Sequence, residues 1–483
     1  SCRKRKKKHI LNNFYQSIPI KKQVIPSLRK LKNNFFKGKK IAITAHHLEQ
    51  SEHRGLASVD KSLIKILYKY GAEIYLITGY DFKSLVKKNK KKDYKNPTSY
   101  IKISDIKKIF EKGRNDRALF ESNIKYKIKL FFELINNLFL LFTNKFEFKY
   151  TLINIKTNKY SVEKLNSRLE YLKEIKGFIC IKNIFHICRV RSMRLILKEP
   201  KLNFNIKEID LVISSSPLSL KYTNKGNAEI IQLIHDGIPF HLSTISESRK
   251  VYYNRLVDAH KYCRCFYTSK DSKKVVTGIL NLKGNKSPNS IINPLPSLNI
   301  EILRKAYTLS NIKSIRQPFI LFNSSIVEHK KVENTINYFK NSDLPKRNFL
   351  LCLAGKLHKN EYCKFIKSIC IENKNILLLD YVSDIEKAWL FLNSSLLIST
   401  SSNEGFGIPV LDALSINLYT LASAIPSHFE ISSINKKNKI ILINKNDKEL
   451  WINYLNKTKT FELDDSESKL NRIDFFKSFI EKY

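Results

Sequence analysis

Several features that mark whole classes of protein are missing from this sequence. It has no uncharged apolar run of 18 residues, so we expect no membrane-spanning helix. No apolar segment follows the basic residues 2–8, which argues against a secretory signal peptide. The eight cysteines lack zinc-site spacing, and a chain of 483 residues is far too long to be a disulfide-stapled mini-domain. We therefore expect reduced structural cysteines in the cytosol.

Motifs of common nucleotide chemistries are also absent. The sequence has neither the phosphate-loop motif that ends in Gly-Lys-Ser/Thr nor a Gly-x-Gly-x-x-Gly fingerprint. ATP hydrolysis and NAD chemistry therefore have little support. An Asp-x-Asp motif is missing too, which agrees with phosphate neutralisation by basic groups and without a metal ion.

Acidic residues are scarce, since 43 Asp and Glu face 87 Lys and Arg and give a formal net charge of +44. One interpretation is biased coding, because the chain is crowded with Lys, Ile and Asn and has only 13 Gly and 13 Pro. The other is an anionic partner, such as a membrane surface, a phosphorylated substrate or nucleic acid. No aromatic–basic RNA motif or zinc spacing is present, so a nucleic acid is not the expected partner. Adhesion to anionic lipid is compatible with both interpretations.

Apolar runs alternate with amphipathic segments in two parts of the chain. In the first part, a run at 41–44 precedes an amphipathic helix that begins near Gly55, and runs at 74–77, 211–213 and 230–236 follow. This strand–helix–strand order predicts a parallel sheet. In the second part the predicted strands are Phe319–Asn323, Phe349–Ala354, Ile376–Leu379, Leu396–Ser399, Tyr419–Ala422 and Ile440–Ile443. The predicted fold is α/β, with two Rossmann-like domains facing a cleft where ligands bind at the carboxyl ends of strands.

Composition divides the chain further. We predict a basic arm at 1–37, a first domain at 38–305, a second domain at 306–460, and a C-terminal helix at 461–483 that packs back on the first domain. Residues 84–205 are rich in lysine and are predicted to be an irregular insertion. Within them, 126–142 is apolar and flanked by lysines. It is either a buried helix or an amphipathic helix in a membrane interface.

The most informative stretch is 403–414, where a glycine-containing turn leads into a helix. Gly405 and Gly407 allow unusual backbone conformations, and a proline suits the first helical turn. The helix directs free N–H groups and a partial positive charge at whatever lies before it. Glu404 lies on the turn and Asp412 about one turn into the helix. A phosphate at the helix mouth and hydroxyls held by both carboxylates would form a nucleotide-sugar pocket.

This stretch and the strand–helix alternation around it resemble the group 1 glycosyltransferases, which are retaining enzymes with the two-domain GT-B fold. The resemblance is strongest over about 315–457. It implies that Glu404 bonds the donor sugar and that Asp412, one methylene shorter than the family's glutamate, holds the ribose hydroxyls. Gly405, Phe406 and Gly407 are expected at the donor as part of the same motif.

The resemblance extends to four other positions. Lys330 falls on a family lysine that neutralises the diphosphate, which makes it a catalytic candidate with Glu404. His235 matches a histidine that faces the donor sugar from the first domain, and it is the third catalytic candidate. Gly55 resembles a glycine in the loop where phosphate and acceptor meet. Glu430 belongs to a segment that closes the donor pocket.

The function implied is hexosyl transfer, of the mannosyl or glucosyl type, from a UDP- or GDP-sugar to a hydroxyl group. No cofactor or metal is expected. The expected acceptor is a polysaccharide or a lipid-linked sugar, and the expected location is the cytoplasm or the inner face of the plasma membrane, with an anionic membrane surface as a partner. The alternatives are a catalytically degenerate protein that binds a glycan or a partner, and a nucleic-acid-binding protein.

Overall fold

The computed structural model describes thirteen main stretches of the chain, together with a few isolated positions. These stretches are residues 36–50, 55–80, 100–112, 147–148 with 150–156, 167–194, 200–204, 209–224, 229–241, 248–282, 294–309, 315–435, 439–461 and 465–482. The predicted basic arm lies outside them, apart from its last two residues. The apolar segment 126–142 also lies outside, apart from Ile135, which is helical and exposed.

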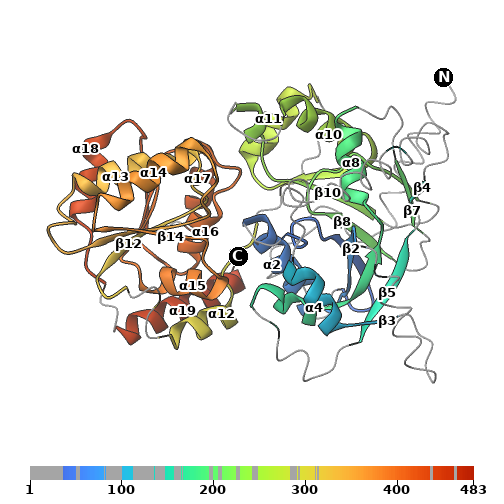
Figure 1. Ribbon diagram of the computed structural model, residues 1–483, viewed down its shortest axis with the longest axis horizontal. Coiled ribbons are helices and arrows are strands. Elements are labelled where there is room, and N and C mark those ends of the chain that lie inside the picture. Colours follow the sequence, from blue (N-terminus) through green and yellow to red (C-terminus); the bar gives the residue numbers. More distant parts are fainter. Residues whose placement is uncertain are drawn as a thin grey trace.

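The described part of the chain folds into two lobes, each built on its own sheet (Figure 1). The first sheet has the order β11-β10-β8-β1-β2-β6-β5-β3, and its pairs are parallel except for β5 with β6. Its strands are β1 (Lys40–Thr44), β2 (Glu73–Thr78), β3 (Tyr100–Lys102), β5 (Thr151–Lys156), β6 (Ile175–Cys180), β8 (Leu211–Ser214), β10 (Glu229–Ile234) and β11 (Arg264–Tyr267). A smaller parallel sheet joins β4 (Glu147–Phe148), β7 (Lys201–Phe204) and β9 (Lys221–Asn224).

The helices of the first domain connect these strands and cover them. They are α2 (Gly55–Lys69), α4 (Ile103–Lys112), η2 (Ser167–Lys173), α8 (Ile184–Ser192), α9 (Ile238–His241), α10 (Arg249–Tyr262) and α11 (Lys270–Ile279). Residues 84–205 are more regular than the sequence predicts, because β3, β5 and β6 extend the main sheet from within them. These strands are short and carry lysines at exposed positions such as Lys176, so their apolar pattern is weak in the sequence.

The second sheet is fully parallel, with the order β14-β13-β12-β15-β16-β17. Its strands are β12 (Phe319–Asn323), β13 (Leu350–Ala354), β14 (Ile376–Asp380), β15 (Leu396–Ser399), β16 (Thr420–Ser423) and β17 (Ile440–Ile443). The helices around it are α12 (Ile300–Tyr307), η4 (Glu328–Lys330), α13 (Val332–Lys340), α14 (Glu361–Ile371), α15 (Asp384–Asn393), α16 (Ile408–Ser415), α17 (Pro426–Ser432), α18 (Lys448–Asn456) and α19 (Ser466–Lys482). The two Rossmann-like domains predicted from the sequence are confirmed.

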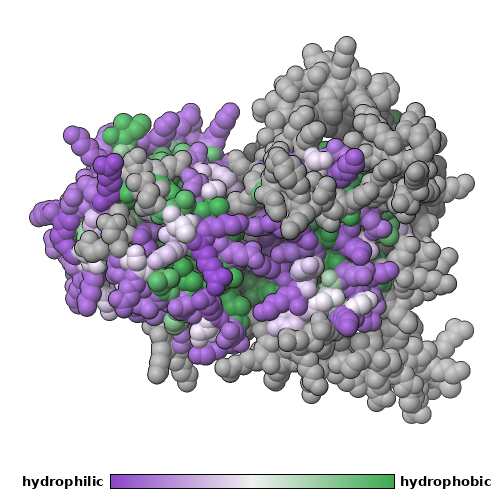
Figure 2. All heavy atoms as spheres, turned by 90° about the horizontal axis from the view of Figure 1, so that it is seen from below, coloured by the Kyte–Doolittle hydropathy of each residue, from purple (hydrophilic) through white to green (hydrophobic). Residues whose placement is uncertain are grey.

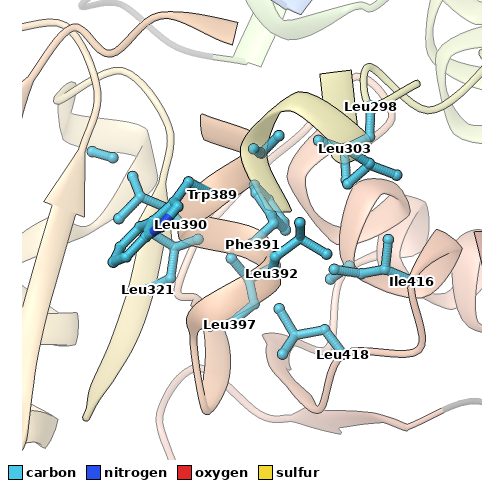
Figure 3. Close-up of a cluster of buried hydrophobic side chains, with 14 of the residues drawn as sticks. Leu298, Leu303, Leu321, Trp389, Leu390, Phe391, Leu392, Leu397, Ile416 and Leu418 are labelled. Atoms are coloured by element: carbon cyan, nitrogen blue, oxygen red, sulfur yellow. The ribbon is translucent and has the colours of Figure 1, made fainter. Parts of the chain in front are cut away.

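One core of the second domain lies between its sheet and a layer of four helices. Trp389 and Phe391 of α15 pack there with residues from α12, α16 and α19, and Figure 3 shows part of this cluster. The ring of Trp389 is stacked on Phe319 with a centroid distance of 6.0 Å. Helix α12 therefore belongs to the second domain, although the predicted boundary at 305/306 divides it.

The C-terminal helix packs differently from the prediction. The sequence predicts that it returns to the first domain, whereas α19 buries Ile473, Phe476 and Phe479 in the core of the second domain. Each large apolar side chain buried in this way contributes about 1.5–3 kcal/mol. The second-domain helices α12, α15 and α16 supply the apolar surface that these side chains cover.

Direct polar contacts join the two domains around the linker that precedes α12. Lys61 Nζ in α2 lies 2.7 Å from Asp384 Oδ2 in α15, and both side chains are mostly buried. Ser62 Oγ donates to the carbonyl oxygen of Pro296 over 3.1 Å. Hydrophilic side chains cover most of the described surface on this side of the molecule (Figure 2). Polar contacts therefore link α2 of the first domain to α15 and to the linker.

Candidate functional site

The glycine-containing turn lies where β15 ends and α16 begins. Gly407 has φ +96° and is the N-cap of α16, and Pro409 lies in the first turn of this helix. An added Cβ on Gly407 would lie 3.0 Å from His428 Cδ2, so both the backbone conformation and the lack of space favour glycine. The turn thus brings Glu404 close to the start of α16, as the sequence predicts.

Glu404 and Lys330, two of the predicted catalytic residues, lie together. Lys330 Nζ is 2.5 Å from Glu404 Oε2, and both residues are 9% exposed. Ser401 Oγ donates to Glu404 Oε1 over 2.8 Å. Burial by itself raises the pKa of Glu404, but Lys330, His428 and Ser401 outweigh it and hold the pKa below the usual value. Glu404 is therefore a buried, ionised carboxylate whose charge Lys330 balances.

Lys330 is held in place by its backbone. The Thr400 hydroxyl lies 3.0 Å from the carbonyl oxygen of Lys330 and 2.8 Å from that of Lys331. Lys331 adopts the left-handed conformation with φ 52° at the turn between η4 and α13. The neighbouring His329 has its pKa lowered to about 4, by burial first and then by Lys330, so it adds no positive charge at neutral pH.

His428 is a site residue that the sequence analysis does not single out. It is fully buried in α17, and its Nδ1 lies 2.8 Å from the carbonyl oxygen of Ser423. A carbonyl only accepts, so Nδ1 carries the hydrogen and Nε2 is an acceptor in the neutral ring. Nε2 has no hydrogen-bond partner among the described residues. In the sequence, His428 is indicated only because it lies in the same segment as Glu430, at 427–430, which resembles one that closes the donor pocket.

Asp412 bonds to the linker between the domains. It is 1% exposed, and its carboxylate accepts hydrogen bonds from Ser297 N at 2.6 Å, Leu298 N at 3.3 Å and the Ser297 hydroxyl. Lys387 Nζ donates to the same hydroxyl over 2.8 Å. Burial raises the pKa of Asp412 despite the opposing effects of Lys387 and Ser297. A ribose on Asp412 would therefore have to replace Ser297.

His235 follows β10 on the first-domain side. Its Nε2 lies 2.5 Å from the carbonyl oxygen of Ser215, so Nε2 donates and Nδ1 is left as an acceptor. Burial first, and the nearby His47 second, lower the pKa of His235 to about 4, so the ring is neutral. The backbone of His235 lies against the turn of the second domain. An added Cβ on Gly405 would come within 2.8 Å of the His235 carbonyl oxygen and 2.7 Å of Asp236 Cβ.

Three residues from the first domain bond across to the turn and to α17. The hydroxyls of Ser269 and Ser272 donate to the carbonyl oxygen of Gly405 over 2.8 and 3.2 Å. The backbone N–H of Lys270 donates to Glu430 Oε2 over 2.9 Å. Burial raises the pKa of Glu430. Glu430 is predicted to lie at the donor. In the structure its carboxylate links α17 to α11 through the bond from Lys270.

The remaining two predicted residues lie apart from these side chains. Phe406 is buried, and its side chain packs in the second-domain core. Gly55 is the exposed first residue of α2, and an added Cβ would meet nothing within 4 Å. Their roles at the donor remain predictions.

In the described ranges, no group of three or more His, Cys, Asp or Glu side chains is placed to hold a metal ion. No helix in the same ranges has the length and apolar character to cross a membrane.

A comparison with known protein families finds a match in the second domain. Residues 309–469 match the family described as glycosyl transferases group 1. No curated protein matches the sequence.

Solved structures resemble the chain over most of its length. Sucrose-phosphate synthase from Thermosynechococcus elongatus is 10% identical with a TM-score of 0.52, covering 92% of this chain and 95% of that one. HepE from Anabaena, in complex with UDP and glucose, is 12% identical with a TM-score of 0.49 and the same coverage. TarM from S. aureus is 14% identical with a TM-score of 0.46, covering 92% of this chain and 96% of that one.

The likeness to the synthase shows a shared fold, with two Rossmann-like domains whose site residues meet at the ends of β10 and β15. The family match covers the second of these domains, which carries Glu404, Lys330 and Asp412. The second domain thus matches the group 1 glycosyltransferases over residues 309–469, and the two facing Rossmann-like domains form a GT-B fold.

Proposed function

We propose that this protein transfers a hexosyl group from a UDP- or GDP-sugar to a hydroxyl acceptor with retention of the anomeric configuration. The observation that carries this proposal is the buried Lys330–Glu404 pair beside the start of α16. A lone ion pair in this place would be a costly way to stabilise the fold, since apolar residues of similar volume serve as well or better. Binding of a ligand that uses both charges would explain why Lys330 and Glu404 are buried together.

In the proposed mechanism Lys330 and Glu404 take different roles when the nucleotide-sugar donor binds. The diphosphate lies at the N-terminus of α16, where free N–H groups and the helix dipole favour negative charge. Lys330 then turns from Glu404 towards the phosphates and stabilises the leaving group. Glu404 stays ionised and accepts hydrogen bonds from the hydroxyls of the transferred sugar. The acceptor oxygen attacks on the face from which the diphosphate departs, and its proton passes to a phosphate oxygen.

The first domain completes the site in this proposal. Its neutral His235 offers an acceptor nitrogen to the sugar and adds no charge that would compete with Lys330 for the phosphates. The bonds from Ser269 and Ser272 to Gly405 keep water out while the sugar–phosphate bond breaks.

Nucleotide release tests this activity directly. UDP- and GDP-glucose and UDP- and GDP-mannose are incubated with the protein, and released nucleotide is measured with water or a simple alcohol as acceptor. NMR of the alcohol glycoside reports whether the anomeric configuration is retained. Release from at least one donor is expected, and an inverted product would contradict the proposal.

A catalytically degenerate protein that binds a glycan or a partner is the second candidate. The bonds of Asp412 to Ser297 and Leu298 favour it, because the carboxylate expected on the ribose is already occupied. Nucleotide-sugar affinity without turnover, in a protein shown to be folded, would support this candidate instead.

For the acceptor we propose a polysaccharide or a lipid-linked sugar at the cytoplasmic face of a membrane. The net charge of +44 supports attraction to anionic lipid. Flotation with vesicles of phosphatidylcholine and phosphatidylglycerol at low salt tests the membrane part. We expect binding that falls as salt is added, and no binding at any salt concentration would remove it.

A further inference from the structure

A second group of polar side chains lies on the first-domain side, beside His235. His47 follows β1, and its Nδ1 is 3.0 Å from Oδ2 of Asp60 in α2. The rings of His47 and His235 lie edge to face with a centroid distance of 6.2 Å. The Ser215 hydroxyl is 3.1 Å from the Thr44 hydroxyl and joins the ends of β1 and β8. Three neighbouring strands and one helix thus bring this group together.

Asp60 occupies a position that the helix pattern would give to an apolar residue. It is fully buried on the face of α2 that also buries Ala57, Leu63 and Ile64. Burial raises the pKa of Asp60, and His235 and Ser215 partly oppose this rise. A buried carboxyl group of this kind destabilises a helix unless it has a specific polar partner, and His47 is that partner.

The protonation state of Asp60 determines which ring nitrogen of His47 carries the hydrogen and which is an acceptor. Burial lowers the pKa of His47 to about 4, so the ring is neutral and carries one hydrogen. A protonated Asp60 donates to Nδ1 and puts the hydrogen of His47 on Nε2, whereas an ionised Asp60 only accepts, puts the hydrogen on Nδ1 and leaves a lone pair on Nε2. His47 Nε2 has no hydrogen-bond partner among the described residues, and the side chain is 12% exposed. The adjacent His235 lies directly against Gly405 of the turn.

We propose that Asp60 is ionised beside His47 and acts as a positioning residue that fixes the tautomer of His47, and that His47 binds a sugar hydroxyl through Nε2. This inference rests on the proposed function, because it takes the ligand to be a sugar. A lone pair on a neutral ring repels phosphate oxygens and attracts the hydrogen of a hydroxyl. The hydroxyl belongs to the transferred sugar or to the acceptor, and the experiments below distinguish these two sources.

The tautomer itself is tested without any substrate. In the full chain labelled with ¹⁵N-histidine, we expect His47 to carry its hydrogen on Nδ1. In Asp60→Asn the side-chain amide can donate to Nδ1 and should move the hydrogen to Nε2. A hydrogen on Nε2 in the unmodified protein, or no change in a folded Asp60→Asn variant, would overturn the proposal.

Binding and turnover are then compared in His47→Gln, which retains a hydrogen-bonding group next to Asp60. Loss of one hydroxyl contact should lower transfer roughly tenfold to hundredfold. If the hydroxyl belongs to the transferred sugar, the variant loses affinity for the nucleotide-sugar but not for UDP or GDP. If it belongs to the acceptor, donor affinity is unchanged and the acceptor KM rises. Unchanged transfer and binding would overturn the proposal.

His260→Gln is the matched control. This histidine lies in the same domain, with Nδ1 2.8 Å from the Leu256 carbonyl oxygen and Nε2 2.7 Å from the Tyr267 hydroxyl. Both of its nitrogens are occupied, so its replacement should leave nucleotide-sugar affinity and turnover unchanged. A wild-type protein that binds no nucleotide would disprove the proposed function, while the tautomer measurement would still report on the His47–Asp60 pair.

Discussion

The two domains contribute opposite kinds of chemistry to the site. The second domain brings the charged groups, with the Lys330–Glu404 pair and Asp412 buried at the start of α16 or within it. The first domain contributes the neutral rings of His235 and His47 and the hydroxyls of Ser269 and Ser272. In the proposed function, a divided site of this kind is complete only when the domains are closed, and sugar transfer would then depend on domain closure.

Glu404→Ala should have the largest effect on transfer and on stability, because it removes the carboxylate of the second domain and leaves Lys330 buried and unpaired. We expect transfer to fall on the order of 10²- to 10³-fold. Losing one partner of a buried pair also costs about 3–5 kcal/mol of unfolding free energy. Nucleotide release and denaturant titration measure the two effects. Glu361→Ala is the control, since Glu361 pairs with Lys364 on the exposed surface, and full transfer activity in Glu404→Ala would contradict the account.

Lys330→Met should reverse the pH dependence of this part of the stability. In the unmodified protein the pKa of Glu404 is held below 4.5, so its contribution is present above that value and is lost as the pH falls through the lowered pKa. Without Lys330, burial raises the pKa of Glu404, and the variant should lose stability as the pH rises. Melting temperatures from pH 8 down to below the lowered pKa of Glu404 would show the two trends, and parallel curves would disprove the pairing.

Gly405→Ala tests the approach of the two domains with no change in charge. The new Cβ would lie 2.7 Å from Asp236 Cβ, so the domains must separate slightly. We expect weaker transfer with little change in affinity for the nucleotide alone, measured by kinetics and calorimetry. Gly278→Ala is the control, because its Cβ would meet nothing within 4 Å. Equal effects of both substitutions would show that the close approach at Gly405 is unimportant.

Asp412→Asn should have the smallest effect on stability. Burial raises the pKa of Asp412, so its ionised form loses stability as the pH rises from the unfolded value towards the folded one. An uncharged amide avoids that loss and still accepts a hydrogen bond from Ser297, so we expect a change within about 1 kcal/mol at neutral pH. A fall in nucleotide affinity would show that the carboxylate exchanges Ser297 for the ribose, while unchanged affinity would show that it serves the linker alone.

The sequence is a better guide to the second domain than to the first. All six predicted strands of the second sheet are present, because each is a mostly apolar run, and the four inner strands β13, β12, β15 and β16 are almost entirely buried. The strands β3, β5 and β6 are missed, since they lie in a lysine-rich region and β6 alternates only weakly. Local periodicity also cannot reveal that α19 covers α12 and α15.

The sequence predicts which residues form the candidate site better than it predicts the contacts between them. Glu404 and Lys330 are indicated by motifs, but they are distant in sequence and nothing in it pairs them. Ser297 has no motif at all, and its bond to Asp412 depends on where the linker passes. His47 and Asp60 are recognised only once β1 and α2 are folded together.

Thermal shift with UDP, GDP, ADP and their sugars, for the unmodified protein and Glu404→Ala together, tests the central claim most directly. We expect one nucleotide family to stabilise both proteins and its sugar to add further stabilisation only when Glu404 is present. An equal additional shift from the sugar in both proteins would contradict the assignment of Glu404 to the sugar. No shift with any nucleotide in a folded protein would contradict the donor site itself.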